Sequence, residues 1–489
     1  MTVHLVGAGP GDPGLLTLRG AEVLRAAEVV VHDRLASSAM LELAPPSADL
    51  VAVGKAPRGP STPQDEINRL LVEHGRAGRR VVRLKGGDPF VFARGGEEAQ
   101  ALAEAGVPFE VVPGISSAIA APAYAGIPVT MRNVATSFTV VTGHRDPWAD
   151  TETDWTAVAG LAVSGGTVVV LMGVATRSEI ADRLAAGGLD PATPVAAVRW
   201  GTRPEQRTVR TTLAGLGRAE VASPSVIVIG AVAGLDLAWF EARPLFGRTV
   251  VVTRAREQAS TLVQLLRALG ADTVELPTIE VVGPADGGRA LARAAAEVAA
   301  ADWVAFTSVN AVERFMALLA DTRALGPAKV AAVGPGTAAA LAGWHVRADL
   351  VPDRAVAEAL VEAFPAGGGR VLVPQAAGAR AVLAEGLRAK GWEVEVVEAY
   401  RTVPATPAPD ALARATAADA ITFTSASTVR GYLDVAGEDA VPEVVVSIGP
   451  VTSEAARAAG VPVSFEADPH TVDGVVAAVV RALEGVTQA

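Results

Sequence analysis

Short apolar runs rich in valine and isoleucine alternate along this chain with longer stretches of alanine, leucine, arginine and glutamate. In the longer stretches apolar residues recur every three to four positions, which predicts helices, whereas the short runs predict buried strands. This alternation is typical of α/β architecture with mainly parallel sheets. In the first half, strands are expected at residues 3–9, 28–33, 80–87, 109–114, 137–144, 167–173, 194–201, 207–213 and 225–232.

Most of these strands end in glycine or a small polar residue. Such endings predict flexible loops at the carboxyl ends of strands, where open α/β sheets bind ligands. The rhythm breaks at residues 234–249, GLDLAWFEARPLFGRT, which we interpret as a short linker between two globular halves.

The second half contains an internal duplication, in which three segments recur in the same order. Residues 302–315 resemble 419–433, residues 330–346 resemble 445–463, and residues 250–281 resemble 370–403. One strand–turn–helix plan used twice predicts two similar lobes. The cleft between two such lobes is a common site for a small molecule.

Composition and charge argue against several classes of function. The 489 residues carry a net charge of −11, which argues against non-specific nucleic-acid binding. The chain has no cysteine, which excludes disulfides and thiolate chemistry, and its six histidines form no H-x-x-x-H pair that would suggest a metal site. We find no signal peptide and no apolar run long enough to span a membrane, so we expect a cytoplasmic protein without metal, nucleic-acid or membrane partners.

Residues 9–14, GPGDPG, satisfy the dinucleotide-binding pattern G-x-G-x-x-G, and Asp33 lies where a ribose-binding acid would be expected. However, Pro10 and Pro13 have no N–H to offer a pyrophosphate, and Asp12 would add a negative charge beside it. The chemistry therefore argues against a dinucleotide. A tight structural turn, or a loop for a ligand without phosphate, remains as the alternative.

Four further strand-end loops carry candidate binding residues. Glycines allow the backbone to approach a ligand closely, and polar side chains at strand ends can bind it. Capping of a helix is the alternative for the two serines, and core packing is the alternative for the methionine. These candidates are Gly86, Gly87, Asp88, Ser116, Ser117, Met172 and Gly201.

Over residues 1–235 the motifs resemble uroporphyrinogen-III C-methyltransferase. The motifs that carry the resemblance are GAGPGDPGLLTLRG, VHDRL, VGK, RLKGGDPFVFARGGEE, VVPGISSA, GIPVT, TVVVLMG, GTRPEQRTV and SPSVIVIGAV, in that order. The resemblance implies a homodimer whose subunit has two α/β domains with S-adenosyl-L-methionine between them. It also implies transfer of two methyl groups to uroporphyrinogen III, giving precorrin-2 and S-adenosyl-L-homocysteine.

The resemblance also assigns roles to residues. Asp33 and Lys55 match the family's proposed proton acceptor and donor, although a turn acid and a surface lysine are the alternatives. Arg34 is expected to pair with a substrate carboxylate, as are some of Arg83, Arg94, Arg132 and Arg145. His32 and Met131 depart from the tyrosine and histidine common in the family. The implied cofactor contacts are Pro10, Gly86, Gly87, Asp88, Val91, Ser116, Ser117, Met172 and Gly201.

Residues 248–489 resemble uroporphyrinogen-III synthase through TVVVTRAREQASTLVQLLRALGADTVELPTIEV, FTSVNAV, VAAVGPGTA, VEAYRTV, FTSASTV and SIGPVTSEAARAAG. The resemblance implies cyclisation of hydroxymethylbilane with inversion of one ring, without metal or cofactor. It further implies one lobe from residues 248–282 and 404–489, and a second lobe from residues 283–403.

Tyr400 matches the family's tyrosine proposed to assist departure of the substrate hydroxyl, and a structural tyrosine at a strand end is the alternative. Arg254 is a further candidate for binding substrate carboxylates. Hydroxyls in loops after strands are expected to help, with helix capping as the alternative. They are Thr307, Ser308, Thr424, Ser425, Ser427 and Thr452.

Together these features predict a bifunctional enzyme of sirohaem or cobalamin synthesis, whose partners are small tetrapyrrole substrates. A tetrapyrrole-methylase two-domain α/β fold at residues 1–240, with an internal boundary near 130–136, is expected before a two-lobed synthase-like α/β fold at 248–489. Three alternatives are an NAD-dependent oxidoreductase, a non-catalytic tetrapyrrole clamp, and an active methyltransferase with a degenerate, non-catalytic synthase half.

Overall fold

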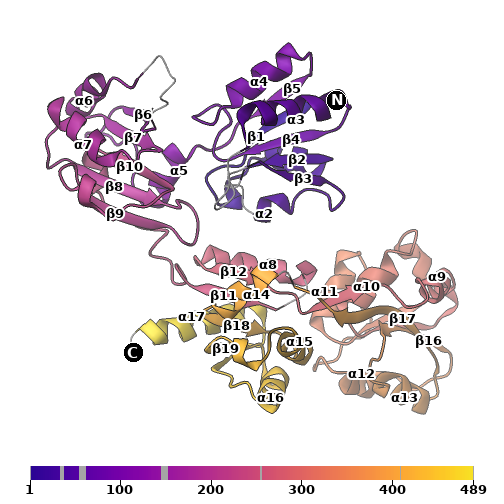
Figure 1. The fold of residues 1–489 in the computed structure, drawn as a ribbon. Coiled ribbons are helices and arrows are strands. Elements are labelled where there is room, and N and C mark those ends of the chain that lie inside the picture. Colours follow the sequence, from indigo (N-terminus) through magenta and orange to yellow (C-terminus); the bar gives the residue numbers. More distant parts are fainter. Residues whose placement is uncertain are drawn as a thin grey trace. The chain divides into compact units, whose positions relative to one another are not determined.

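The computed structural model describes residues 2–33, 38–53, 62–144, 152–253, 256–407 and 409–487. Contacts between residues divide the chain into two compact units. The first unit comprises Met1–Arg248 and Leu266–Asp272, and the second comprises Thr249–Leu265 and Thr273–Ala489. Each unit contains two five-stranded sheets covered by helices (Figure 1).

The first sheet of the first unit is parallel, with strand order β3-β2-β4-β1-β5. Its central strands are buried on both faces, as expected from their continuous valine runs. The edge strand β3 was missed from the sequence because it is short and largely exposed. The strands are β1 (Val3–Gly7), β2 (Val29–His32), β3 (Asp49–Ala52), β4 (Val81–Lys85) and β5 (Phe109–Val112).

The second sheet, with order β6-β7-β10-β8-β9, is mixed rather than mainly parallel. Only β6 and β7 pair in parallel, whereas β10 runs antiparallel to β7 and β8, and β8 runs antiparallel to β9. A short connection between neighbouring strands permits only antiparallel pairing, and seven residues join β8 to β9. The strands are β6 (Phe138–Thr142), β7 (Thr167–Leu171), β8 (Pro194–Arg199), β9 (Arg207–Thr212) and β10 (Ser225–Ile229).

Helices cover both faces of both sheets. In the first sheet, α3 and α4 pack on one face and α1 and α2 on the other, and in the second sheet α6 and α7 lie opposite α5. The helices are α1 (Leu18–Arg25), α2 (Ser38–Leu41), α3 (Gln64–Arg76), α4 (Gly95–Glu104), α5 (Ser117–Tyr124), α6 (Trp155–Val163) and α7 (Arg177–Ala186). Short 3-10 helices are η1 (Pro13–Leu15), η2 (Leu216–Arg218) and η3 (Ala231–Gly234).

The segment that we expected to be a linker packs on the first unit. Trp239 and Phe240 stack edge-to-face on Tyr124, with ring centroids 5.0 and 4.8 Å away. The Trp239 Nε1 atom donates to the carbonyl of Ala123 at 2.9 Å, and Glu241 accepts from the Gln206 side chain at 2.8 Å. Aromatic pairs of this kind stabilise a docked segment, so residues 239–241 are anchored rather than free.

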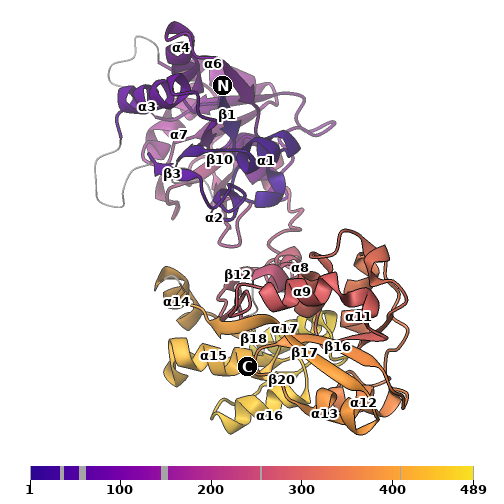
Figure 2. The ribbon, with the colours of Figure 1, turned by 90° about the vertical axis from the view of Figure 1, so that its right-hand side faces the viewer.

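The two sheets of the second unit repeat one plan, which agrees with the duplication in the sequence. Their orders are β12-β11-β18-β19-β20 and β13-β17-β16-β14-β15, so four successive strands correspond in each. Figures 1 and 2 show that the first of these sheets combines the beginning and the end of the unit, since β11 pairs with β18. The strands are β11 (Thr249–Val252), β12 (Asp272–Glu275), β13 (Ile279–Val282), β14 (Trp303–Phe306), β15 (Lys329–Ala332), β16 (Arg370–Ala376), β17 (Glu393–Pro404), β18 (Ala420–Phe423), β19 (Val444–Ser447) and β20 (Phe465–Glu466).

Helices again cover these sheets, and none in the described part of the chain is long and apolar enough to cross a membrane. They are α8 (Arg256–Ala268), α9 (Arg289–Ala296), α10 (Val309–Met316), α11 (Pro335–Gly343), α12 (Ala357–Ala363), α13 (Val382–Ala389), α14 (Pro409–Thr416), α15 (Ala426–Ala436), α16 (Pro450–Ala458) and α17 (Val472–Thr487). The 3-10 helices are η4 (Val298–Ala300), η5 (Thr322–Leu325) and η6 (Glu438–Ala440).

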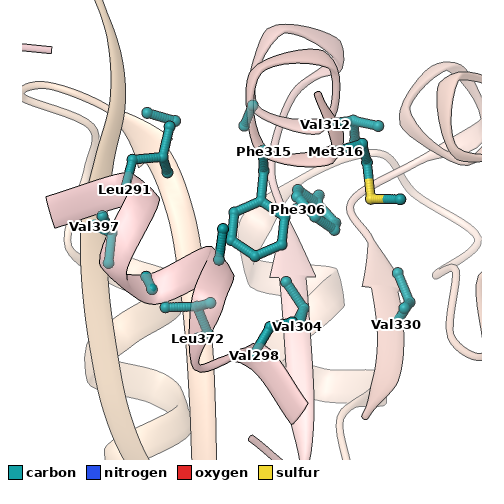
Figure 3. Close-up of a cluster of buried hydrophobic side chains, with 14 of the residues drawn as sticks. Leu291, Val298, Val304, Phe306, Val312, Phe315, Met316, Val330, Leu372 and Val397 are labelled. Atoms are coloured by element: carbon teal, nitrogen blue, oxygen red, sulfur yellow. The ribbon is translucent and has the colours of Figure 1, made fainter. Parts of the chain in front are cut away.

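The duplicated turns match in detail. Ser308 caps α10 after β14, and Ser425 caps α15 after β18, each through its side-chain oxygen. Both α11 and α16 begin with a proline that follows an extended glycine. The turn at Ser308 joins β14 to α10. Phe306 of β14 and Phe315 of α10 lie at the centre of a buried cluster (Figure 3), with ring centroids 5.7 Å apart.

Candidate functional site

A cavity of about 240 Å³ in the first unit gathers most of the predicted cofactor residues. It is bordered by loops that follow β1, β4, β7 and β8 and by the start of α5. Loops at the carboxyl ends of strands are where open α/β sheets bind ligands. Of the nine predicted contacts, those that line the cavity are Pro10, Gly86, Gly87, Val91, Ser116, Ser117, Met172 and Gly201.

The loops meet because glycine lets their backbones touch. The Gly9 N–H donates to Gly87 O at 3.1 Å, and the Gly87 N–H donates back to Gly9 O at 2.8 Å. A Cβ atom at Gly7 would lie 2.5 Å from Gly114, a separation that the structure could not accommodate without moving the backbone. The opening glycine-rich stretch thus brings the loops after β1, β4 and β5 together.

Asp12, the acid of that stretch, is held in place by neighbouring residues. Its carboxylate accepts from the Gly14 N–H and from the Tyr124 hydroxyl, both at 2.8 Å, and its own N–H donates to the Thr202 hydroxyl at 3.0 Å. Burial, together with the Asp12 carboxylate, raises the pKa of Tyr124 above its ordinary value. Asp12 therefore ties the first loop to α5 and to the loop after β8.

Asp88 is the predicted contact that does not line the cavity. Its two carboxylate oxygens accept from the Phe90 N–H at 2.8 Å and from the Gly114 N–H at 3.0 Å. These hydrogen bonds join the loop after β4 to the loop after β5. The geometry is consistent with a positioning role for Asp88 beside Gly86 and Gly87, and its direct contact with the cofactor stays a prediction.

The sequence reasoning missed an aromatic part of the cavity wall. Phe92 and Trp200 line the cavity, and the Arg203 guanidinium lies 4.8 Å from the centre of the Trp200 ring. Burial lowers the pKa of Arg203. Phe92, Met172 and Trp200 have positive φ angles of 51°, 54° and 50°, a strained conformation that clusters at binding sites. A weak signal for this wall was present in the sequence, since Trp200 lies directly before Gly201 at a strand end.

Asp33, the expected proton acceptor, lies at the end of β2 beside a buried charged network. The Arg83 Nη2 atom donates to Asp33 Oδ1 at 2.6 Å, and Arg83 Nε donates to Glu98 Oε1 at 3.0 Å. The Lys85 ammonium also contacts Glu98 Oε1, at 2.8 Å. Desolvation, followed by the neighbouring Arg83 charge, lowers the pKa of Lys85. Arg83 is therefore a buried partner of Asp33 rather than an exposed group.

The structure describes only some of the remaining candidate residues of the first half. Lys55, Arg34 and Arg145 lie outside the described residues. Arg94 pairs with Glu97 at 2.7 Å, and this pairing lowers the pKa of the Glu97 carboxyl. The departures His32 and Met131 lie at the end of β2 and in an exposed turn, respectively, and neither lines the cavity.

In the second unit, a cavity of about 330 Å³ is lined by Tyr400, Thr307 and Ser308, among other residues. Tyr400 is only 8% exposed, and its hydroxyl donates to Ser308 Oγ at 3.1 Å. Gln375 and Arg380 line the same cavity, and Arg380 also pairs with Glu358 at 2.7 Å. The expected tyrosine and two of the expected hydroxyls are thus together in the lobe built on β14, β16 and β17.

The other predicted hydroxyls lie in the other lobe and do not line this cavity. Thr424, Ser425 and Ser427 are at the start of α15, where Ser425 forms a capping box with Thr428. Thr452 is buried within α16. Helix capping, the alternative role, is therefore observed for Ser425. Arg254 lies outside the described residues. Within the described part of the chain, no cluster of three or more His, Asp or Glu could hold a metal ion.

Comparison with known proteins assigns each half to a family. The family of Tetrapyrrole (Corrin/Porphyrin) Methylases matches residues 2–217, and the family Uroporphyrinogen-III synthase HemD matches residues 260–477. The Porphyrin biosynthesis protein HemD of Ruminiclostridium josui is 38% identical over 473 residues, which cover 93% of each chain.

Other relatives match about half of the chain. The Uroporphyrinogen-III C-methyltransferase of Bacillus subtilis is 46% identical over 281 residues, which cover 56% of this chain and 58% of that protein. A crystal structure of a Thermus thermophilus uroporphyrin-III C-methyl transferase, complexed with S-adenyl homocysteine, is 42% identical. Its match covers 47% of this chain and 98% of that chain, with a TM-score of 0.42.

The two families match successive parts of the chain, and the relative from Ruminiclostridium josui extends across both. The chain therefore belongs to the tetrapyrrole methylases in its first half and to the uroporphyrinogen-III synthases in its second half.

Proposed function

We propose that the chain converts hydroxymethylbilane into uroporphyrinogen III and then into precorrin-2. The methyltransferase would occupy residues 1–240 and act as a homodimer, and the synthase would occupy residues 248–489. One observation carries the first assignment: eight residues expected at the cofactor, from five separate segments, converge on one cavity. Chance convergence of residues so far apart in sequence is improbable in a chain of this length.

The cavity suits S-adenosylmethionine better than a dinucleotide. Its lining is mainly apolar, and Pro10 stands where a pyrophosphate would need an N–H donor. The chain's own contacts would be backbone groups of Gly86, Gly87 and Gly201, the hydroxyls of Ser116 and Ser117, and the apolar surfaces of Val91 and Met172. When bound, S-adenosylmethionine supplies an electrophilic methyl group.

Apolar side chains beside the cavity would receive the tetrapyrrole. Phe90, Val91, Phe92 and Met172 are 57%, 37%, 45% and 52% exposed, which is unusual for large apolar residues gathered at one site. Exposed apolar surface of this kind marks ligand-binding surfaces. A porphyrinogen has an apolar face that would cover these residues, and Arg34 is proposed to pair with one of its carboxylates.

Asp33 would act on the substrate. When a pyrrole carbon gains a methyl group, the ring becomes cationic, and loss of a proton from the methylated macrocycle restores neutrality. The Asp33 Oδ1 atom is held by Arg83, and Oδ2 has no hydrogen-bond partner among the described residues. That oxygen is placed to stabilise the cation or to accept the proton. Lys55 would serve as the proton donor.

In the second half, Tyr400 would assist loss of the substrate hydroxyl. Its phenol would donate a proton to the departing oxygen, so that water leaves and a cationic azafulvene remains. Ser308 would orient the phenol through the hydrogen bond observed between their oxygens. Thr307, Thr424, Ser425, Ser427, Thr452 and Arg254 are proposed to bind substrate carboxylates, and this half would use no cofactor.

The two halves are tested separately with the purified chain. Methyl-labelled S-adenosylmethionine and uroporphyrinogen III should give a dimethylated product, and absence of label would refute the first assignment. Hydroxymethylbilane alone should give the type III isomer. Formation of only the type I isomer, which arises without enzyme, would instead support a degenerate synthase half.

A further inference from the structure

A second cavity in the first unit has a different chemical character from the cofactor cavity. Its volume is about 440 Å³, and four arginines line it: Arg177, Arg199, Arg207 and Arg218. Glu220 is the one carboxylate among its lining residues in the described chain. The cavity therefore concentrates positive charge in a protein whose net charge is −11.

The four arginines come from separate elements that the fold brings together. Arg177 begins α7, Arg199 ends β8, Arg207 begins β9, and Arg218 ends η2. Arg199 and Arg207 are direct partners across the antiparallel β8–β9 pair. Like charges directly opposite each other in a sheet destabilise it. A bound anion between them would remove this repulsion.

Two of the guanidinium groups have unused donors. The Nε atoms of Arg177 and Arg199 are buried and have no hydrogen-bond partner among the described residues. The Arg177 Nη1 atom donates to the Val174 carbonyl at 2.9 Å, which fixes one side of this side chain. Arg199, Arg207 and Arg218 form no ion pair with any described carboxylate. Buried donors without partners are rare in folded proteins and point to a missing partner.

The arginine cavity lies across the sheet from the cofactor cavity. Along β8, Ala197 and Arg199 line the arginine cavity, whereas Val198, and Trp200 directly after the strand, line the cofactor cavity. Successive side chains of a strand point to opposite faces, so along β8 the two cavities lie on opposite faces of the sheet, and Ser225 at the start of β10 lines both. No step proposed for methyl transfer uses the four arginines.

We propose that this cavity binds a small polyanion that carries two or more carboxylate or phosphate groups. A guanidinium matches the geometry of both groups and can form two parallel hydrogen bonds with each. Arg177 and Arg199 would hold one group through the Nε atoms that now lack partners. Arg207 and Arg218, which are exposed at the rim, would hold a second group.

The test is calorimetric titration of the full chain with citrate, with pyrophosphate, and with acetate as a monovalent control. We expect saturable binding of citrate or pyrophosphate at one site per chain, weaker at high salt because salt screens charge. The tighter of the two ligands distinguishes a carboxylate from a phosphate source. Absence of binding by both, or acetate binding as tight as theirs, would overturn the proposal.

A variant pair locates the binding. The double variant Arg199→Gln/Arg218→Gln should weaken binding by roughly ten-fold or more, because it removes two charge-assisted contacts. Arg25→Gln is the matched control, because Arg25 is exposed on α1 and does not line either cavity, and its affinity should stay within about two-fold of the parent. Circular dichroism checks folding, and Arg218→Gln alone replaces the double variant if that one unfolds. Unchanged affinity in a folded variant would refute the site.

Discussion

Replacement of Asp88 by alanine should weaken binding of S-adenosylmethionine without removing any side chain from the cavity wall. Asp88 accepts from Phe90 N–H at 2.8 Å and from Gly114 N–H at 3.0 Å, which joins two of the loops that border the cavity. A hydrogen bond to a charged group contributes about 1.5 to 3 kcal/mol, and the lower value applies because Asp88 is half-exposed. Loss of both bonds, about 3 kcal/mol, corresponds to roughly 100-fold weaker binding.

Isothermal titration calorimetry with three variants tests this reasoning. Asp88→Asn keeps one acceptor oxygen and should weaken binding by only about ten-fold. Asp182→Ala removes an exposed acid of α7 that does not line the cavity and should change nothing. Unchanged affinity in Asp88→Ala would refute the positioning role. An equal loss in Asp88→Asn and Asp88→Ala would show that the carboxylate charge, and not the two hydrogen bonds, determines affinity.

Three further predictions concern other parts of the chain. Tyr400→Phe should slow cyclisation by about 10²-fold or more, since it removes the proposed proton donor. The same change should leave methylation of added uroporphyrinogen III unchanged. An unchanged cyclisation rate would contradict the role proposed for Tyr400. Tyr124→Phe should lower the free energy of unfolding by about 1 to 2 kcal/mol at pH 8. Because the pKa of Tyr124 is raised in the folded state, the stabilisation that this residue contributes is present below pH 10 and is lost at higher pH. The free energies of unfolding of the two proteins, measured in urea, should therefore converge above pH 10. A difference that stays constant with pH would refute this. Glu98→Gln leaves Lys85 buried without the carboxylate that it contacts and leaves Arg83 paired with Asp33 alone among the described carboxylates, so it should cost about 3 to 5 kcal/mol in urea unfolding. A loss below about 1 kcal/mol would contradict the importance of this network.

Much of the fold could be predicted from local patterns. Each valine-rich run in the first half became a strand, because central strands of these sheets are buried on both faces and need continuous apolar residues. The duplication likewise predicted one plan used twice, and the second unit has two sheets in which four strands correspond in order. The exposed strand β3 was missed because it lacks this signal. The antiparallel pairing of β8, β9 and β10 was also missed, since strand direction depends on the connections between strands rather than on apolar content.

The lining of the cavity was predictable where glycine and strand ends marked it, and not where it depends on tertiary contacts. Gly86, Gly87 and Gly201 lie at strand ends and reach the cavity. The hydrogen bond that Asp88 accepts from Gly114 could not be predicted, because the two residues are 26 positions apart in the sequence. The same limit applies to the arginine cavity, whose four arginines lie on four separate elements. The docking of Trp239 on Tyr124 is another long-range contact that no local pattern predicts.

The most direct test of the account supplies the intact chain with hydroxymethylbilane and methyl-labelled S-adenosylmethionine under anaerobic conditions, with products followed by chromatography and mass. A dimethylated type III tetrapyrrole is the predicted product, because it requires both halves to work in sequence. Label incorporated only when uroporphyrinogen III is added would contradict the synthase assignment. No label from either substrate would contradict the central claim that this chain is a methyltransferase joined to a synthase.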